Sequence, residues 1–271
     1  MHPPLHPPMR PWQDLAWTDF AALPPDTVAI LPTAAIEQHG PHLPLATDAE
    51  INADILAHTA AKLPPGLTVL TLPMQAIGLS VEHIRFPGTL TASAETLLAL
   101  CTEIGQSVAR AGIRRLLFLN SHGGQPQILD LAARRLRSTC NLLAVTCSWG
   151  RLGLPDNLIG TEERRHGIHG GTIETSLMLR LRPDLVRMDH ARYFRSTWQS
   201  RPHTLLEPEG RTGFGWETQD LNPEGALGDA SRATAEIGEA ILAHTTTQLA
   251  TLLGELAGTD PDTVLRPGPV G

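Results

Sequence analysis

The segment from Leu31 to Asp48 reads LPTAAIEQHGPHLPLATD and brings carboxylates and imidazoles together in a short span. Glu37 and His39 are two residues apart, so both side chains leave the same face of an extended backbone. Asp48 follows a stretch with two prolines, which a helix would tolerate poorly. Such carboxylate and imidazole groups are ligands that zinc, manganese and iron accept. The alternative interpretation is a polar loop after a buried strand.

A second candidate lies in the motif NSHGGQ, which contains His122. The glycines that follow, Gly123 and Gly124, let the backbone turn tightly and leave space beside the imidazole for a metal ion or a substrate. Asn120 can hold this loop by bonding to backbone groups. An ordinary turn between a strand and a helix, with an incidental histidine, is the alternative.

Two further segments contain candidate groups. RRHGIHGGTIETS contains His169, whose proton affinity suits acid–base chemistry near neutral pH. It also contains Glu174, which lies at an expected helix start and is either a metal ligand or a cap favoured by the helix dipole. VEHIRFPGT is expected to form a loop, in which Glu82 and His83 are candidates for substrate binding. Simple solvent exposure is the alternative for both.

These groups are positioned by an alternation of predicted strands and helices. Apolar runs predict strands at Val28–Ala35, Leu67–Leu72, Arg114–Leu119 and Leu142–Ser148. Helical spacing predicts helices at Glu50–Lys62, Ala92–Ala111, Gln125–Ser138 and Ser231–Leu256. The alternation favours an α/β fold made of parallel βαβ units, with helices on both faces of the sheet. Sites in such sheets form beyond the carboxyl ends of the strands, where Glu37, His39 and His122 all fall.

The remainder of the chain shows no repeat and no linker that would divide it. We expect one domain over residues 1–271, with loose tails at 1–12 and 258–271. The segment Tyr193–Gly228 is rich in glycine, proline and glutamate, and is expected to form long loops near the site or a subunit contact.

Composition narrows the classes of partner. The net charge is -7 and there is no basic stripe with interleaved aromatic residues, so we expect no nucleic-acid partner. The three cysteines show no paired spacing, which argues against a disulfide framework and a cysteine zinc site. The N-terminal residues are rich in proline and short of apolar residues, and no apolar run has membrane length, so we expect neither a signal peptide nor a membrane span. We therefore expect a cytoplasmic protein that binds a small molecule and no membrane.

Together the candidates form a set of three carboxylates and two imidazoles: Glu37, His39, Asp48, His122 and Glu174. Five such groups around one shared carboxylate are what two divalent ions about 3.5–4 Å apart require. Such an ion pair can activate water and polarise a carbonyl oxygen. The set therefore indicates hydrolytic chemistry with two zinc, manganese or iron ions per chain.

The order of the motifs resembles the creatininase (creatinine amidohydrolase) family. The resemblance rests on LPTAAIEQHGPHLPLATD, EHIRFPGT, NSHGGQ, HGGTIETS and GALGDASRATAEIGE, which extend from Leu31 to Glu239. It implies a three-layer α/β/α fold with a mostly parallel sheet, a binuclear metal site and hydrolysis of a C–N bond other than a peptide bond. It also implies a homo-oligomer, because members are commonly hexamers built as trimers of dimers.

The resemblance also assigns roles to individual residues. Family metal ligands fall on Glu37, His39, Asp48 and His122, with Asp48 bridging, and the catalytic histidine falls on His169. Creatininase takes a further ligand from a glutamate at the position of Gly124. Relatives with an H-G-G motif, including the formamidopyrimidine deformylase branch, use the glutamate of the E-T-S motif instead, which is Glu174 here.

Two departures from the family pattern concern the substrate. Creatininase has a tryptophan where this chain has Arg165 and a tyrosine where it has Gly123. An aromatic lid supplies stacking area that glycine cannot replace. We therefore expect a substrate other than creatinine, with Gly123 beside it and Arg165 facing a polar or anionic group.

The leading hypothesis is a metal-dependent amidohydrolase acting on a small amide, lactam or formamide. In it, Glu37, Asp48 and His122 hold one ion. His39, Asp48 and Glu174 hold the other, and His169 passes a proton to the departing nitrogen. One alternative is a deformylase or ring hydrolase acting on a ribosylated heterocycle or a carbocyclic ketone. The non-enzymatic alternative is a metal-stabilised binding protein, which a carboxylate-rich ligand set disfavours.

Overall fold

The computed structural model of the chain describes residues 8–201, 205–210, 212–266 and 268. Its centre is a five-stranded sheet in the order β1-β3-β2-β4-β5, in which every neighbouring pair is parallel. The strands are β1 (Met9–Pro11), β2 (Val28–Thr33), β3 (Val69–Thr71), β4 (Arg115–Asn120) and β5 (Leu143–Ser148). The parallel α/β fold predicted from the alternation of elements is confirmed.

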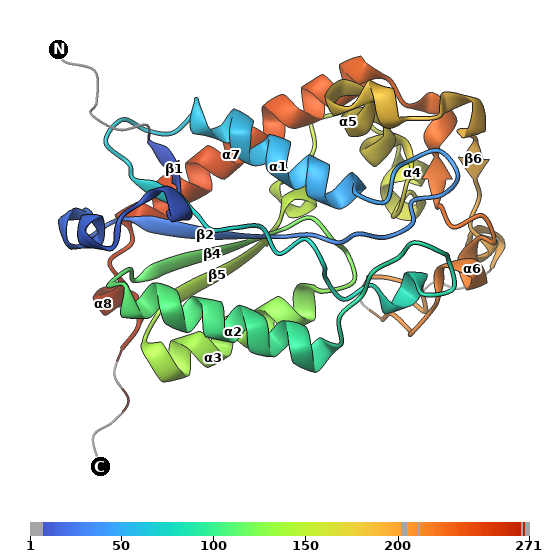
Figure 1. Cartoon of the computed structure of the whole chain (residues 1–271). Coiled ribbons are helices and arrows are strands. Elements are labelled where there is room, and N and C mark those ends of the chain that lie inside the picture. Colours follow the sequence, from blue (N-terminus) through green and yellow to red (C-terminus); the bar gives the residue numbers. More distant parts are fainter. Residues whose placement is uncertain (1–7, 202–204, 211, 267, 269–271) are drawn as a thin grey trace.

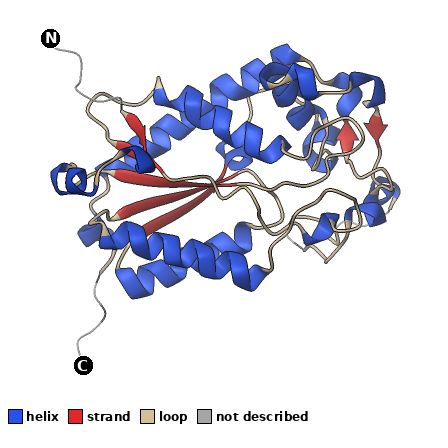
Figure 2. Ribbon diagram, viewed as in Figure 1, coloured by secondary structure: helices blue, strands red, loops and turns tan. Residues whose placement is uncertain are grey.

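Helices cover both faces of this sheet (Figure 1). On one side lie α1 (Thr47–Ala60), α5 (Thr172–Leu181) and α7 (Ala235–Gly258), and on the other α2 (Ala94–Arg110) and α3 (Pro126–Cys140). Figure 2 shows the resulting three layers, with long loops beyond one end of the strands. The shorter elements are α4 (Thr161–His166), α6 (Thr218–Leu221), α8 (Pro261–Val264) and the antiparallel pair β6 (Tyr193–Phe194) and β7 (Gly228–Asp229).

The alternation of side chains along β2 explains why both faces are covered. Val28 and Ile30 belong to the apolar core beneath α1 and α7, whereas Ala29 and Leu31 belong to the core beneath α2 and α3. All four residues are fully buried. A strand that is apolar on both faces appears in the sequence as a continuous apolar run, which is the signal that predicted it.

The register between β2 and β4 determines where the site forms. The two strands pair from Val28 opposite Arg115 to Thr33 opposite Asn120. Their carboxyl ends are therefore level, and the segments that follow enter the same region of the molecule. This is the edge at which the candidate residues were expected.

Some of the described residues within both predicted tails form regular secondary structure. Residues 1–7, 267 and 269–271 lie outside the described residues. Met9–Pro11 forms the edge strand β1, where a proline is tolerated because one side of the strand needs no partner. Pro261–Val264 forms α8, which is capped by the Asp260 side chain, and Asp262 pairs with Arg114 at 2.9 Å. Within the described residues, no helix has the length and hydrophobicity needed to cross a membrane.

Candidate metal centre

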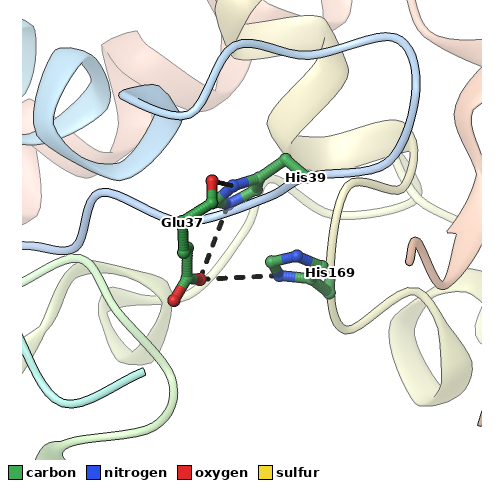
Figure 3. Close-up of side chains that lie close together, drawn as sticks. All are labelled: Glu37, His39 and His169. Carbon is green, nitrogen blue, oxygen red and sulfur yellow. Dashed lines mark hydrogen bonds and ion pairs between the residues drawn. The ribbon is translucent and has the colours of Figure 1, made fainter. Parts of the chain in front are cut away.

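Glu37 and His39 lie in the loop that follows β2. Both side chains are buried, at 1% and 0% exposure, and the distance from Glu37 Oε1 to His39 Nε2 is 3.9 Å. Figure 3 shows the two side chains turned toward one another and toward His169. The prediction that they leave the same face is confirmed, although β2 ends at Thr33, two residues earlier than expected.

Asp48 comes from the first turn of α1, which begins at Thr47 and not at the predicted Glu50. The helix begins earlier because the Thr47 amide and hydroxyl both donate to the Pro44 carbonyl, at 3.3 Å and 2.7 Å. Asp48 Oδ1 lies 3.5 Å from His39 Nε2, and Oδ2 lies 3.4 Å from His122 Nδ1. Asp48 therefore stands between the two imidazoles.

His122 follows β4, as predicted. The side-chain nitrogen Nδ2 of Asn120 donates to the backbone carbonyl of His122 at 2.6 Å, and Oδ1 of Asn120 accepts from the backbone amide of His122 at 3.2 Å. Asn120 therefore holds this loop as expected. The ring nitrogen Nε2 lies 2.7 Å from the Leu79 carbonyl, which can only accept a hydrogen bond. This contact places the proton on Nε2 and leaves Nδ1 free, 3.2 Å from Glu37 Oε1.

Glu174 lies in the first turn of α5, at the helix start predicted for it. Glu174 Oε2 accepts from the Gly170 amide at 2.6 Å, which is the contact expected of a cap. The same oxygen lies 3.9 Å from His39 Nε2. The same position of the Glu174 carboxylate is therefore compatible with both interpretations, a helix cap and a metal ligand.

Five of these side chains form two groups that share the carboxylate of Asp48, and Glu37 and His39 also form a third possible group with His169. The first consists of Glu37, Asp48 and His122, and the second of His39, Asp48 and Glu174. In each group the potential ligand atoms lie within 4.8 Å of one another. Asp48 is common to both groups, because its two oxygens face different histidines.

Three buried atoms at this place indicate a cation. Glu37 Oε2, His39 Nε2 and Asp48 Oδ2 have no hydrogen-bond partner among the described residues, whereas buried polar atoms are nearly always paired. The Nδ1 atom of His39 lies 3.0 Å from the Glu37 carbonyl, which fixes the proton on Nδ1 and leaves Nε2 as a ligand atom. A set of carboxylates and neutral imidazoles fits zinc, manganese or iron.

The pKa values of these groups reflect their mutual proximity. Burial lowers the pKa of His39, but Asp48, Glu174 and Glu37 outweigh burial and raise it to about 9. Burial raises the pKa of Asp48, but the nearby imidazoles of His122 and His39 lower it to about 2. Burial also raises the pKa of Glu174 to about 7. Burial lowers the pKa of His122, but Glu37 and Asp48 outweigh burial and raise it well above its ordinary value. A metal ion would therefore have to displace protons from His39, His122 and Glu174.

His169 lies beside this centre in a neutral state. Burial and the neighbouring imidazoles of His39 and His83 hold the pKa of His169 well below its ordinary value. His169 Nε2 lies 2.7 Å from the Gln38 carbonyl, so this nitrogen bears the proton. The other nitrogen, Nδ1, lies 3.9 Å from Glu37 Oε1 and can accept a proton (Figure 3).

Comparison with known proteins assigns this architecture to a family. Residues 13–253 match the protein family Creatininase, described as creatinine amidohydrolase. The chain belongs to the creatininase family. It is a metal-dependent hydrolase, so the non-enzymatic alternative is wrong.

Relatives in this family have more than one named activity. The chain is 34% identical to the mycofactocin precursor peptide peptidase of Mycobacterium ulcerans (strain Agy99) over 220 residues, which cover 79% of this chain and 80% of the relative. It is 29% identical to the creatinine amidohydrolase of Pseudomonas putida, with 84% and 90% covered. Among solved structures, a creatininase variant described as Zn-Zn type matches this chain with a TM-score of 0.70 and 27% sequence identity. The match covers 90% of this chain and 97% of the creatininase chain. A manganese creatininase structure is equally well covered, with a TM-score of 0.68.

In this creatininase-family chain the loop with Glu82 and His83 closes over the centre. His83 is buried at 2% exposure, and its Nε2 lies 3.4 Å from Glu37 Oε1, so the solvent-exposed alternative is wrong for this residue. The Glu82 side chain is 13% exposed, with Oε1 3.6 Å from His122 Nε2. Both residues line the cavity that contains the predicted ligands.

Gly123 and Arg165 occupy different places. Gly123 lines the same cavity and has open space beside its α-carbon. Arg165 forms an ion pair with Glu207 and lines a neighbouring cavity with Trp198. Gly123 therefore lies at the candidate metal centre. Arg165 is not among the described residues that line the cavity of this centre.

Three residues of the cavity region were missed in the sequence. Gln38 Nε2 donates to the Gly225 carbonyl at 2.7 Å and also lies 2.7 Å from His83 Nδ1. Its signal was its position between the two candidate ligands Glu37 and His39. Glu209 and Trp216 line the cavity from the segment Tyr193–Gly228, for which long loops near the site or a subunit contact were expected.

Proposed function

We propose that this chain is a binuclear-metal amidohydrolase. One ion would be held by Glu37, Asp48 and His122, and the second by His39, Asp48 and Glu174. The single observation that supports this most strongly is that Asp48 belongs to both ligand groups. A carboxylate with one oxygen directed at each of two histidines is suited to bridging two cations.

When bound, two divalent ions would lower the pKa of water and polarise the carbonyl oxygen of the substrate. The chain supplies the proton transfer. His169 is neutral and has its free Nδ1 near Glu37, so it is suited to accept a proton from the attacking water. The same atom can then donate that proton to the nitrogen that leaves. The contact between Nε2 and the Gln38 carbonyl keeps the ring in this orientation throughout.

We propose a small amide, lactam or formamide as the substrate. The cavity around the ligands measures about 30 Å³. This volume leaves room for only a few water-sized bodies beside the ligands, so only the reacting group of a substrate can enter. Creatinine is a poor candidate, because Gly123 offers no ring where creatininase has a tyrosine. The aromatic side chain that lines this cavity is Trp216, which comes from a different segment.

A second candidate is the hydrolysis of a peptide bond. The observation that favours it is the 34% identity to a protein named mycofactocin precursor peptide peptidase. Because a peptide bond is also an amide, the same residues would act in both reactions. The two candidates differ in what lies outside the cavity, where a peptide needs contacts along its backbone.

The test begins with protein stripped by a chelator and then supplied with zinc, manganese or iron. We expect two ions per chain by elemental analysis. In a panel made of formamide, 2-pyrrolidinone, creatinine and an unmodified pentapeptide, we expect hydrolysis of formamide or 2-pyrrolidinone. Cleavage of the pentapeptide alone would select the second candidate. One ion or none in an active preparation would contradict the two-metal arrangement, and efficient creatinine turnover would contradict the substrate class.

A further inference from the structure

The carboxylate of Glu163 lies behind the loop that bears His169. Glu163 belongs to the short helix α4 and is partly buried. Its Oε1 accepts a hydrogen bond from the Thr172 amide at 2.6 Å, and its Oε2 accepts one from the Asp229 amide at 2.8 Å. Each carboxylate oxygen therefore binds a different segment of the backbone.

These two segments are joined at the catalytic histidine. His169 and Leu227 form an antiparallel bridge, with the Leu227 amide donating to the His169 carbonyl at 2.6 Å. Thr172 lies shortly after His169 in one segment, and Asp229 lies shortly after Leu227 in the other. By accepting hydrogen bonds from both, Glu163 links the two segments just beyond the bridge. The Thr172 hydroxyl adds a third link by donating to the Asp229 carbonyl at 2.7 Å.

The same carboxylate holds the start of the helix that supplies Glu174. Thr172 is the first residue of α5, and Glu174 lies in its first turn. An anion that accepts a hydrogen bond from an amide at a helix N-terminus is favoured by the helix dipole. The contact thus fixes the position of the first turn relative to α4.

The backbone around Glu163 is shaped to fit its carboxylate. A methyl group at Gly167 or Gly171 would overlap Glu163 Oε1, and one at Gly228 would lie 2.6 Å from it. The three glycines approach the carboxylate from two stretches of chain, the loop that bears His169 and the strand β7. A solvated acid at the start of a helix would need no such clearance, so the close fit distinguishes Glu163 from a simple capping residue.

We propose that Glu163 is a positioning residue that holds His169 and Glu174 in the metal cavity from behind. This inference rests on the proposed two-metal function, because it concerns the placement of one ligand and of the proton-transfer group. Glu163 itself contacts neither the substrate nor an ion. Its effect passes through the backbone of the loop between Gly167 and Thr172.

The test compares Glu163→Gln with Glu162→Gln. Glutamine keeps the length of Glu163 but can accept only one of the two amide hydrogen bonds. Glu162 is the neighbouring residue, is 80% exposed and faces His166 at 3.9 Å, so its variant controls for the loss of a charge from α4. Glu163→Ala is a third variant that removes both hydrogen bonds.

The first measurement is hydrogen–deuterium exchange of the metal-free protein, which does not depend on activity. In Glu163→Gln we expect the peptides containing Thr172 and Asp229 to exchange about tenfold faster, while β2 and β4 keep their protection. The second measurement is cobalt binding, followed by the visible absorption of the bound ion. Loss of a group that orients a ligand weakens metal binding about 10–100-fold. We expect the cobalt affinity at one of the two sites to fall by this factor, and further in Glu163→Ala.

The outcomes separate this inference from the proposed function. Unchanged exchange or unchanged cobalt binding in Glu163→Gln, or an equal effect in Glu162→Gln, would overturn the positioning role. A wild-type protein that binds two cobalt ions but hydrolyses no amide would instead contradict the proposed function and leave the exchange and cobalt results valid. Fast exchange throughout the variant, including β2 and β4, would show a general structural role and would also overturn the inference.

Discussion

The carboxylate of Glu82 fills the space beside the α-carbon of Gly124. A methyl group added at Gly124 would overlap Glu82 Oε1 and would lie 2.6 Å from His122 Nε2. The resemblance noted in the sequence places a glutamate of creatininase at the position of Gly124, and in this chain a carboxylate from a different loop lies beside that position. The glycine and the glutamate are thus structurally dependent on each other.

The substitution Gly124→Ala tests this dependence. Its methyl group would displace Glu82 and His122, so we expect the metal affinity to fall about 10–100-fold. The adjacent variant Gly123→Ala has nothing within 4 Å of the added methyl group and should bind metal like the wild type. Adding Glu82→Ala to Gly124→Ala should recover part of the affinity. Equal affinities for the two single variants, measured by zinc titration, would contradict this dependence.

The shared role of Asp48 predicts different metal counts in two variants. Because Asp48 belongs to both ligand groups, Asp48→Asn should lose both ions. Glu174→Gln should lose one ion, since Glu37, Asp48 and His122 remain intact. Elemental analysis after dialysis distinguishes the two cases. Retention of two ions by the Asp48 variant would exclude a bridging role.

Replacement of His169 should affect turnover and leave metal binding intact. His169→Asn removes the free Nδ1 that faces Glu37, and loss of a general acid–base group lowers kcat about 10²–10⁴-fold. We expect a KM close to the wild-type value and an unchanged metal count. A large loss of metal instead of kcat would make His169 a ligand, which its contact with Glu37 and His39 would also permit.

The buried residue His42 should make the metal-free protein sensitive to acid. Burial lowers the pKa of His42 to about 4, while its Nε2 contacts the Gly170 carbonyl and the Thr175 hydroxyl, both at 3.0 Å. The unfolded chain, with a pKa near 6.5, takes up the proton first, so protonation favours unfolding. The free energy of unfolding therefore has its full value above pH 6.5, where His42 is neutral in both states, and it decreases as the pH falls toward 4.

The size of this effect follows from the two pKa values. It amounts to roughly 3 kcal/mol at pH 4. In chelator-treated samples, the free energy of unfolding should fall more steeply from pH 6.5 to 4 for the wild type than for His42→Gln. Parallel pH profiles, measured by urea denaturation, would show that His42 makes no such contribution.

The interpretation of single residues was most accurate where the signal was local. The position of Glu174 at a helix start and the hydrogen bonds of Asn120 within its own loop both depend on neighbours in the chain, and the structure has both. The start of α1 was misplaced because the Thr47 hydroxyl bonds to Pro44, which extends the helix to include Asp48. Arg165 was expected to face the substrate, but its ion pair with Glu207 comes from a distant loop that no local pattern indicates.

The sequence by itself determined the order of strands and helices and the chemical types of the ligands. Both are local properties: hydrophobic periodicity reflects the two faces that each element buries, and metal preference follows from the donor atoms. The tertiary structure alone decided which donors converge. The level ends of β2 and β4 bring Glu37 to His122, and the packing of α1 against α5 brings Asp48 and Glu174 to the same ring nitrogen of His39. These distances depend on strand register and helix packing between distant segments, which no stretch of sequence contains.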